Sequence, residues 1–595
     1  MNQIFAELKR RGVLKVATAY LVVSWLVLEI GHTLFLIFEL PHLGLQIVFV
    51  LLAIGFPVAT AAAWRYQFGT AKQDHGAAHT DEHGSQLAIV FGVVALLVIG
   101  TVVVMRFLGY DRHGSGHETA AEHTSAQEHQ PPAPAVAFAP PLHSIAVMPF
   151  VNMSGDRKDD YFSDGLTEEL LNSLARINEL RVAARTSSFS FKGAALDIPS
   201  IARKLNVAAV LEGSVRKSGH KVRITAQLVD AANGYELWSQ TFDRELRDIL
   251  ALQTEIATAV MSAMKVQLLA DQASKVTAGG TQHADAFDAY LRGVNLLAQR
   301  TDEASDRAAV STLEEALRVD PQFALAHAAY AKALLIVGID WTPDKERAQR
   351  LFTAARASAE RAIELEPTLG AAYEAKALVI QGTSMDFAAV DAAISRAMEL
   401  EPGSVAILTK FADAAGRAER RAEALDATAR AVQLDPLSAA AWRMRGVQLY
   451  FAAQHAEAQA AFGRALELQP NNRLNKVWMA RNQIVAGNVD AAIALCESEK
   501  FWAAQQCLAI AYYRDGRRAD ATQQLRSLQK DYGDAAAYQY AQVYAQWGER
   551  QQAIEWLYTA VRVGDAGVGD LKVDPMLDPL RSAPEFAEIV GRLQF

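Results

Sequence analysis

Prolines recur at a nearly constant interval through the second half of the chain, and this feature limits the possible folds more than any other. Pro367, Pro402, Pro436 and Pro470 each close an alanine-rich run, as in RAIELEP, RAMELEP, RAVQLDP and RALELQP. Counted from Pro321, successive prolines are separated by 46, 35, 34 and 34 residues. A fixed period of this length is the signature of a chain built from similar, stacked units.

The unit that ends at Pro470 identifies the kind of repeat. Small and large residues alternate along it at positions that resemble a tetratricopeptide (TPR) helix pair: Trp442, Gly446, Leu449, Ala458, Phe462, Ala465 and Pro470. Small residues stand where two helices cross closely, and proline ends the second helix. We expect about eight repeats between residues 287 and 565, within an all-α TPR superhelix with a C-terminal cap that spans 283–595.

Stacked helix pairs predict a concave groove lined by the first helix of each pair. Such a groove suits a peptide or protein segment, so we expect a protein partner. Aromatic and arginine side chains most often carry interface energy. The candidate contacts on first helices are Tyr373, Lys376, Arg443, Gln448, Tyr512 and Tyr540.

The first 110 residues contain three apolar stretches, at 16–38, 45–64 and 86–108. Each is long enough to cross ~30 Å of hydrocarbon as a helix, so we expect a domain of three transmembrane helices in a lipid bilayer. Glu29 and His32 lie in the first stretch on one helix face. This intramembrane polar pair either couples a signal or fixes helix packing by a hydrogen bond.

The basic residues around these stretches predict the topology. Lys9, Arg10, Arg11 and Lys15 precede the first stretch, whereas only Arg106 and Arg112 flank the third. Because basic residues favour the cytoplasmic side, the N-terminus is expected in the cytoplasm. Three crossings then place the large C-terminal part outside the cytoplasm.

Residues 111–142 are rich in Gly, His, Glu and Pro and cannot bury a core, so a flexible linker is expected there. Histidines at 75, 79 and 83, and at 113 and 117, have the spacing of four that a zinc site on a helix would use. No cysteine accompanies them, and Gly76 and Gly84 weaken a helix there. A solvated segment without metal or cofactor is the preferred interpretation.

Residues 143–271 predict a compact α/β domain. Ser144–Phe150 is a short apolar run typical of a buried strand, and Val222–Leu228 alternates apolar and polar residues, typical of a strand with one buried face. Asn233-Gly234 is a hairpin signal. The runs SIAVMPFVNMSGD, YFSDGLTEELLNSLARI and VLEGSVRKSGHKVRITAQLVDAANGYELWSQTFDREL resemble the TolB amino-terminal-like domain of bacterial membrane-anchored proteins.

The resemblance implies more than a fold. Relatives in that wider family often carry a winged-helix or class III nucleotide-cyclase domain before the membrane. Neither is expected here, because only eight residues precede Lys9. The α/β domain itself shows no nucleophile–base pair, no phosphate loop and no metal-ligand spacing.

Two cysteines, Cys496 and Cys507, are expected on adjacent helices. Outside the cytoplasm they could oxidise, but they lie at unequal distances from the intervening turn. Both a disulfide and two free thiols therefore stay open.

These features predict a multidomain, non-catalytic protein of the bacterial inner membrane, with its large C-terminal part in the periplasm. We expect a scaffold, receptor or assembly factor that binds another protein of the bacterial envelope through its TPR groove. The first alternative is a transmembrane signalling subunit that relays a periplasmic signal to a cytoplasmic partner. A weaker alternative is an enzyme related to nucleotide cyclases. Nucleic acid is not an expected partner, because the net charge is −9.

Overall fold

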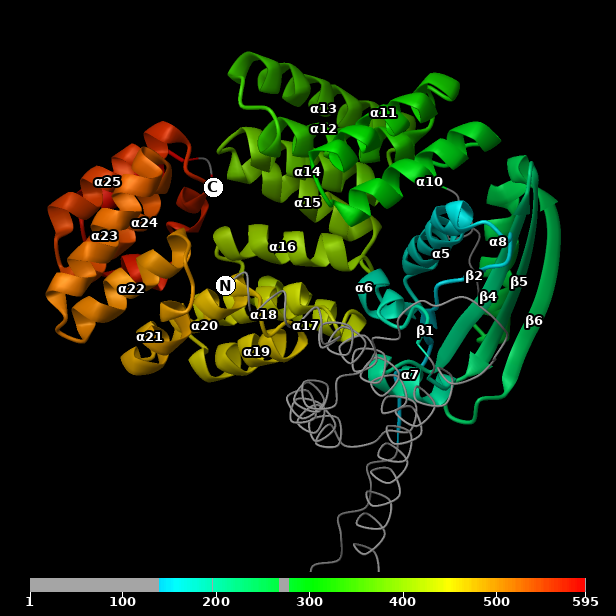
Figure 1. The fold of residues 1–595 in the computed structure, drawn as a ribbon, viewed down its shortest axis with the longest axis horizontal. Coiled ribbons are helices and arrows are strands. Elements are labelled where there is room, and N and C mark those ends of the chain that lie inside the picture. Colours follow the sequence, from blue (N-terminus) through cyan, green and yellow to red (C-terminus); the bar gives the residue numbers. More distant parts are fainter. Residues whose placement is uncertain (1–137, 195, 267–277, 594) are drawn as a thin grey trace, which may run out of the picture. The chain divides into compact units, whose positions relative to one another are not determined.

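The computed structural model describes residues 138–595 apart from 195, 267–277 and 594. These residues form one compact unit, with an α/β domain followed by a helical array (Figure 1). The α/β domain contains these strands and helices: β1 (Ser144–Val147), β2 (Val151–Asn152), α5 (Asp160–Ala175), β3 (Arg181–Val182), α6 (Arg185–Phe189), α7 (Ile198–Leu205), β4 (Ala209–Ser218), β5 (Lys221–Asp230), β6 (Glu236–Glu245) and α8 (Ile249–Ala263).

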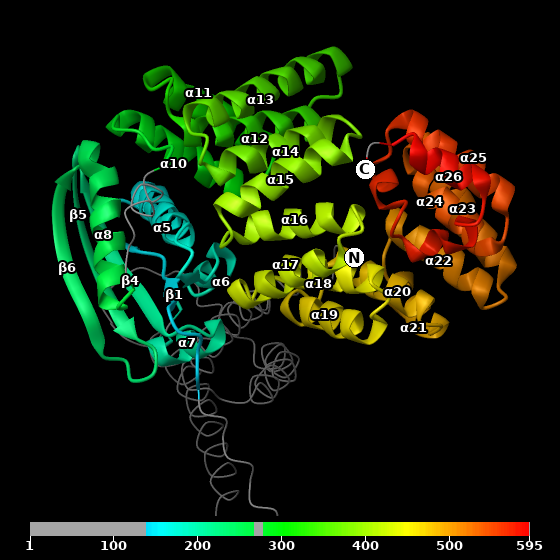
Figure 2. The same cartoon turned by 180° about the vertical axis from the view of Figure 1, so that it is seen from behind.

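The sheet has the strand order β3-β1-β4-β5-β6, and the short β2 also pairs with β4. Strands β3, β1 and β4 are parallel, whereas β4, β5 and β6 form an antiparallel meander whose long strands lie side by side in Figures 1 and 2. Ile145 and Val147 face the cluster that contains α5 and α8, and Ala146 and Met148 face α7. Both faces of β1 are therefore covered, which explains its uninterrupted apolar run.

The helical array consists of eight consecutive helix pairs. Its helices are α10 (Ala284–Gln299), α11 (Glu303–Val319), α12 (Ala324–Asp340), α13 (Lys345–Leu365), α14 (Gly370–Thr383), α15 (Phe387–Leu400), α16 (Val405–Arg417), α17 (Arg421–Leu434), α18 (Ala439–Phe451), α19 (His455–Leu468), α20 (Arg473–Val485), α21 (Val489–Glu497), α22 (Trp502–Arg514), α23 (Arg518–Tyr532), α24 (Ala537–Trp547) and α25 (Arg550–Val563). The array has the TPR repeats expected from the proline period.

The prolines end helices as their chemistry requires. Asp320, Glu401 and Asp435 each precede a proline, and each has left the helical conformation, with ψ of 94°, 68° and 64°. Proline disfavours the α conformation of the residue before it, so the second helix of each pair stops at that point. We call these residues the acid–proline turns.

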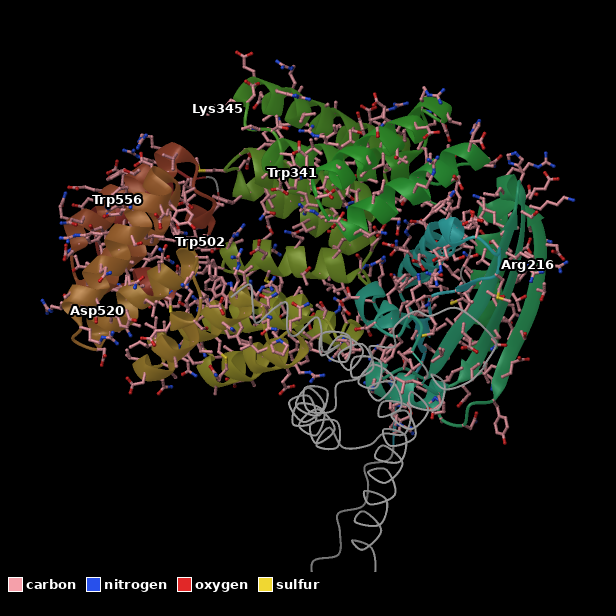
Figure 3. The ribbon with its side chains drawn as sticks, viewed as in Figure 1. Arg216, Trp341, Lys345, Trp502, Asp520 and Trp556 are labelled. Atoms are coloured by element: carbon pink, nitrogen blue, oxygen red, sulfur yellow. The ribbon has the colours of Figure 1, made fainter. Side chains whose placement is uncertain are left out.

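The longer interval after Pro321 lengthens the second pair. Its helices α12 and α13 have 17 and 21 residues, against 14 each in α14 and α15. Trp341, labelled in Figure 3, follows α12 and donates its indole N–H to Asp306 of α11 at 2.8 Å. The indole therefore folds back onto the preceding pair instead of standing free as a partner contact.

The fold class predicted from the sequence is wrong in its first element, the three transmembrane helices. The structure is mainly helical with one small sheet, and no helix in the part of the chain that it describes is long and apolar enough to cross a membrane. The stretches 16–38, 45–64 and 86–108, with Glu29 and His32, lie outside the described residues.

Ala458 tests the packing of the array. It is fully buried in the cluster that joins α18 and α19, beside Phe462, whose ring fills the space that Gly446 leaves. Ala458→Trp is expected to lower the free energy of unfolding by ~1–3 kcal/mol or more, because a tight core has no room for an indole. Ala456→Trp, at an exposed position of the same helix, should cost less, and equal losses in urea unfolding would contradict the packing described.

The inner face of the helical array as the candidate functional site

First helices form the inner layer of the array. The first helices of neighbouring pairs contact one another, as in α12 with α14, α16 with α18 and α22 with α24, while each second helix packs between two first helices. A stack with this pattern curves toward its first helices. The inner face is therefore the surface on which a partner segment would lie.

Polar side chains cross this inner face from helix to helix. Lys332 of α12 binds Glu374 of α14 at 2.5 Å, and Gln381 of α14 donates to Asp413 of α16 at 3.3 Å. Lys410 lines a small cavity with Gln381 and Asp413, and the described part of the chain gives it no ion pair. Glu374 is buried, so we call the half-buried Gln381, Lys410 and Asp413 the open inner face.

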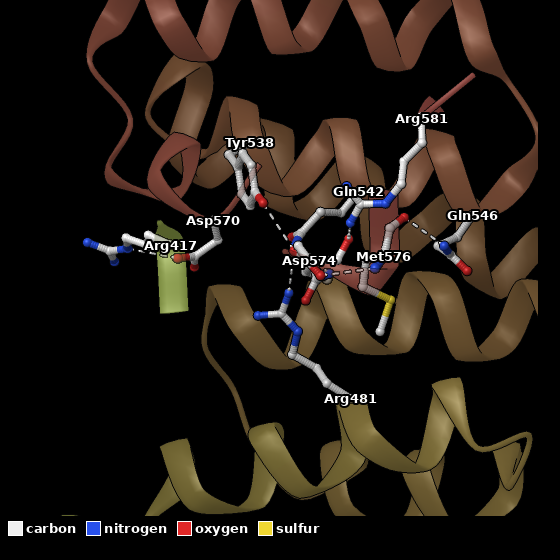
Figure 4. Close-up of polar contacts among 10 residues, drawn as sticks. Arg417, Arg481, Tyr538, Gln542, Gln546, Asp570, Asp574, Met576 and Arg581 are labelled. Carbon is white, nitrogen blue, oxygen red and sulfur yellow. Dashed lines mark hydrogen bonds and ion pairs between the residues drawn. The ribbon is translucent and has the colours of Figure 1, made fainter. Parts of the chain in front are cut away.

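Beyond α16 the inner face is covered by the chain itself. Residues 566–580 follow the last helix pair as two 3-10 turns, η4 (Ala566–Asp570) and η5 (Pro575–Leu580), and we call them the C-terminal segment. Asp570 binds Arg417 of α16 at 3.0 Å, and Asp574 binds Arg481 of α20 at 3.3 Å (Figure 4). The segment thus contacts first helices of the fourth and sixth pairs.

Asp574 is the centre of this contact. It is 1% exposed, accepts from the Tyr538 hydroxyl at 3.1 Å and from Gln542, and caps the backbone N–H of Met576 at 3.0 Å. Figure 4 shows these side chains converging from α20, α24 and the C-terminal segment. A buried carboxylate is stable only when its oxygens are paired in this way.

The neighbouring Asp570 is held in the same manner. Burial raises the pKa of Asp570, while the Arg417 guanidinium acts to lower it. Arg417 also lies 3.3 Å from Asp413 on its own helix, so one guanidinium serves two carboxylates.

Apolar residues fix the C-terminal segment as part of the fold. Five of its side chains are buried against α24, α25 and their neighbours: Val568, Leu571, Met576, Leu577 and Leu580. Burying a side chain of this kind contributes about 1.5–3 kcal/mol. The segment is therefore an integral part of the array rather than a loosely bound tail.

The structure distributes the six predicted contact residues over different environments. Tyr540 is fully buried and donates to the backbone of Leu528 and Gly533, so it is a packing residue. Gln448 is buried against Gly416, and Tyr512 is buried with its hydroxyl on Glu497 at 2.8 Å.

The other three are half-buried. Arg443 donates to Asn475 of α20 at 3.0 Å and so contacts the next first helix. Tyr373 packs among the apolar residues of α15 and α16. Lys376 lies about 200° around α14 from Glu374 and lines a cavity of about 290 Å³ with Arg356 and Glu360 of α13. It therefore faces away from the inner face.

The α/β domain joins the array through apolar packing of α5 on α10 and through two acid–proline turns. Arg176, at the end of α5, lies 3.4 Å from Glu401 and donates to the Ala278 carbonyl at 3.2 Å. Asp435 accepts from the Ser187 backbone N–H at 3.0 Å and from its hydroxyl at 2.6 Å. The sequence had shown these acids only as the ends of helices.

A buried carboxyl in this junction predicts a dependence on pH. Burial raises the pKa of Glu169 from 4.5 to about 7, although Arg176 nearby and the Tyr290 hydroxyl act to lower it. Between these values the folded chain keeps a proton that the unfolded chain releases. The free energy of unfolding should therefore fall by about 1–3 kcal/mol as pH rises from about 5 to about 8.

Glu169→Gln checks this expectation, because its amide is neutral at every pH and can still accept from Tyr290. The free energy of unfolding, measured in urea at several pH values, should fall less between about pH 5 and about pH 8 in Glu169→Gln than in the unaltered chain. The exposed-carboxylate control Glu255→Gln should show the same fall as the unaltered chain. An undiminished fall in Glu169→Gln would contradict the assignment.

Among the residues that the structure describes, no group of His, Cys, Asp and Glu could hold a metal ion. The family described as "HilA/YgeH-like transcriptional regulator, second domain" matches residues 142–259, which is the α/β domain. The TolB-like assignment of this domain stays a prediction from its sequence.

One curated protein is similar over a longer stretch. "Putative adenylate cyclase 3" of Rhizobium meliloti strain 1021 is 37% identical over 242 residues, which cover 39% of this chain and 40% of that protein. The chain thus spans less than half the length of this relative.

Solved structures resemble parts of the chain. Pseudomonas aeruginosa PilF is 18% identical and covers 37% of this chain and 96% of its own, with a TM-score of 0.29. The TPR protein YrrB is 18% identical over 32% of this chain and 90% of its own, with a TM-score of 0.24. Human IFIT1 is 17% identical over 53% of this chain and 81% of its own, with a TM-score of 0.33.

Proposed function

We propose that the chain is a non-catalytic scaffold that binds a segment of another protein on the open inner face. One observation carries the proposal: the inner layer of first helices is covered by the C-terminal segment beyond α16, but presents the unpaired Lys410 beside Gln381 and Asp413. The partner's place is thereby restricted to the surface of α14 and α16.

Two parts of the proposed function rest on the sequence alone. These are the TolB-like nature of residues 143–271 and the location of the array outside the cytoplasm of a bacterial cell. Alkaline phosphatase fused after Pro141 tests the location, because it is active only outside the cytoplasm. An inactive fusion that is stably produced would overturn it.

Site-specific crosslinking tests the binding surface. A photoreactive residue at position 410 should capture a partner in living cells. The same residue at position 376 is the matched control, because it lies on α14, the first helix of the preceding repeat, but faces α13. Capture of one protein from 410 and not from 376 supports the proposal, and equal capture from both positions contradicts it.

Charge reversal gives a second measurement. Lys410→Glu should weaken the binding of the captured protein by about tenfold, or ~1.4 kcal/mol, because a cation on the binding surface becomes an anion. Lys376→Glu should leave the affinity unchanged. Unfolding curves of both variants should match the unaltered chain, since the described structure assigns neither lysine an ion pair.

A second candidate function has one observation in its favour, the name of the Rhizobium meliloti relative. A purified full chain that makes cyclic AMP from ATP, with activity following the protein peak, would favour that candidate. The scaffold proposal expects no turnover.

A further inference from the structure

Cys496 and Cys507 face each other inside the array. Cys496 lies in the last turn of α21, and Cys507 lies in the middle of α22. Both are fully buried, and their Sγ atoms are 2.7 Å apart. The connection at 498–501 allows for their unequal distances from the turn, because it carries the chain past the end of α21 before α22 begins.

The surroundings of the pair offer each thiol no reaction partner except the other thiol. The enclosing cluster is apolar and includes Val477, Ile484, Ile493, Phe501 and Leu525. No histidine or carboxylate of the described residues joins the two sulfurs in a possible metal site. Metal binding is therefore not the chemistry that this pair offers.

The repeat that contains Cys496 has the shortest second helix in the array. Helix α21 has 9 residues, whereas the second helices before and after it, α19 and α23, have 14 and 15. A shorter helix buries less apolar surface against its neighbours. A covalent link from α21 to α22, the first helix of the next repeat, would offset that loss by restricting the unfolded chain.

We propose that Cys496 and Cys507 form an intramolecular disulfide bond that ties the shortened repeat to the first helix of the next repeat. The co-reactant is a disulfide-bearing oxidant, either a protein disulfide or a small one such as oxidised glutathione. One cysteine thiolate attacks a sulfur of the oxidant, which forms a mixed disulfide and releases one thiolate of the oxidant. The second cysteine thiolate then attacks the protein sulfur of the mixed disulfide and releases the other thiolate.

Electrons and protons balance in this reaction. The two cysteines lose two electrons and two protons, the oxidant's disulfide gains the electrons, and its two released thiolates take up protons. The hydrogen bond with Cys507 and burial both raise the pKa of Cys496 in the folded array. A protonated, buried thiol reacts slowly, so the bond forms while the repeat folds rather than afterwards.

Counting free thiols tests the proposal. The full chain is unfolded in denaturant with reductant and then refolded in a buffer of reduced and oxidised glutathione. After an acid quench it is denatured again and alkylated. We expect no alkyl group on either cysteine, a mass lower by two hydrogen atoms, and one digest product that joins the peptides of Cys496 and Cys507.

Cys507→Ser is the matched control, and it should carry one alkyl group or one glutathione. Two alkyl groups on the unaltered chain, refolded with oxidised glutathione alone, would overturn the proposal. If the chain does not refold, the count is made after native chain is incubated with oxidised glutathione just below its melting temperature, where local opening exposes the pair. There too, a digest product that joins the two cysteine peptides supports the proposal, and two alkyl groups on the unaltered chain overturn it.

Thermal unfolding gives an independent readout. The oxidised chain should melt several degrees above the chain held in reductant, and this difference should vanish in Cys507→Ser. Equal melting temperatures of oxidised and reduced unaltered chain would show that no link stabilises the repeat.

Discussion

Asp574→Ala is expected to lower the free energy of unfolding of the array by about 3–5 kcal/mol. The change leaves Arg481 buried without its counter-charge and removes an acceptor from Tyr538 and Gln542. Breaking a buried, hydrogen-bonded charge pair by removing one partner has a cost of this size. Urea unfolding and hydrogen exchange of α20 and α24 would measure it.

Asp578→Ala is the matched control in the same segment. Asp578 binds Arg581 at 2.6 Å, but both side chains are largely exposed, at 59% and 38%. Exposed ion pairs contribute little, so the unfolding curve should stay unchanged. If both variants lost equal stability, the buried network would not be what holds the C-terminal segment.

Arg176→Ala is expected to separate the unfolding of the α/β domain from that of the array, at a cost of about 3–5 kcal/mol. The guanidinium is 5% exposed and lies between Glu401 and the Ala278 carbonyl. Its removal leaves Glu401 and Glu169 without the cation that offsets their burial. Calorimetry should then show two transitions in place of one.

Arg223→Ala controls for loss of an arginine in the same domain. Arg223 binds Asp243 at 2.7 Å across β5 and β6, with 57% and 63% of the two side chains exposed. We expect no change in the calorimetric profile. Two transitions in both variants would mean that the junction does not depend on Arg176.

The helix pairs of the array could be predicted from the sequence because each unit repeats the same local chemistry. Proline ends a helix whatever surrounds it, and small residues such as Gly446 and Ala458 mark close crossings in every pair. Strand β5 could also be predicted from the sequence, because its apolar and polar residues alternate. Val222, Ile224 and Ala226 are buried, and Arg223 and Thr225 lie between them.

The course of the C-terminal segment could not be predicted. Asp570 and Asp574 stand in a stretch with no period, and their partners Arg417 and Arg481 lie far back in the sequence. Nothing local distinguishes them from surface charges. Only the curvature of the folded array brings these four residues together.

The predicted contact residues show a second limit. A first helix has one face toward the inner surface and others toward second helices, and sequence period alone does not separate them. Tyr540 and Lys376 both lie on first helices, yet one is buried in packing and the other faces α13. Contacts such as Lys332 with Glu374 are needed to orient each helix.

The acid–proline turns constrain how this array can change in length. Solenoids ordinarily gain or lose units freely, because each unit contacts only its neighbours. Here Glu401 and Asp435 must meet Arg176 and Ser187 of a separate domain. Duplication of one unit before Glu401 would carry both acids one step along the superhelix, out of reach of their partners. Growth between Asp435 and the C-terminal segment is restricted as well, because Asp570 must still reach back to Arg417 of α16.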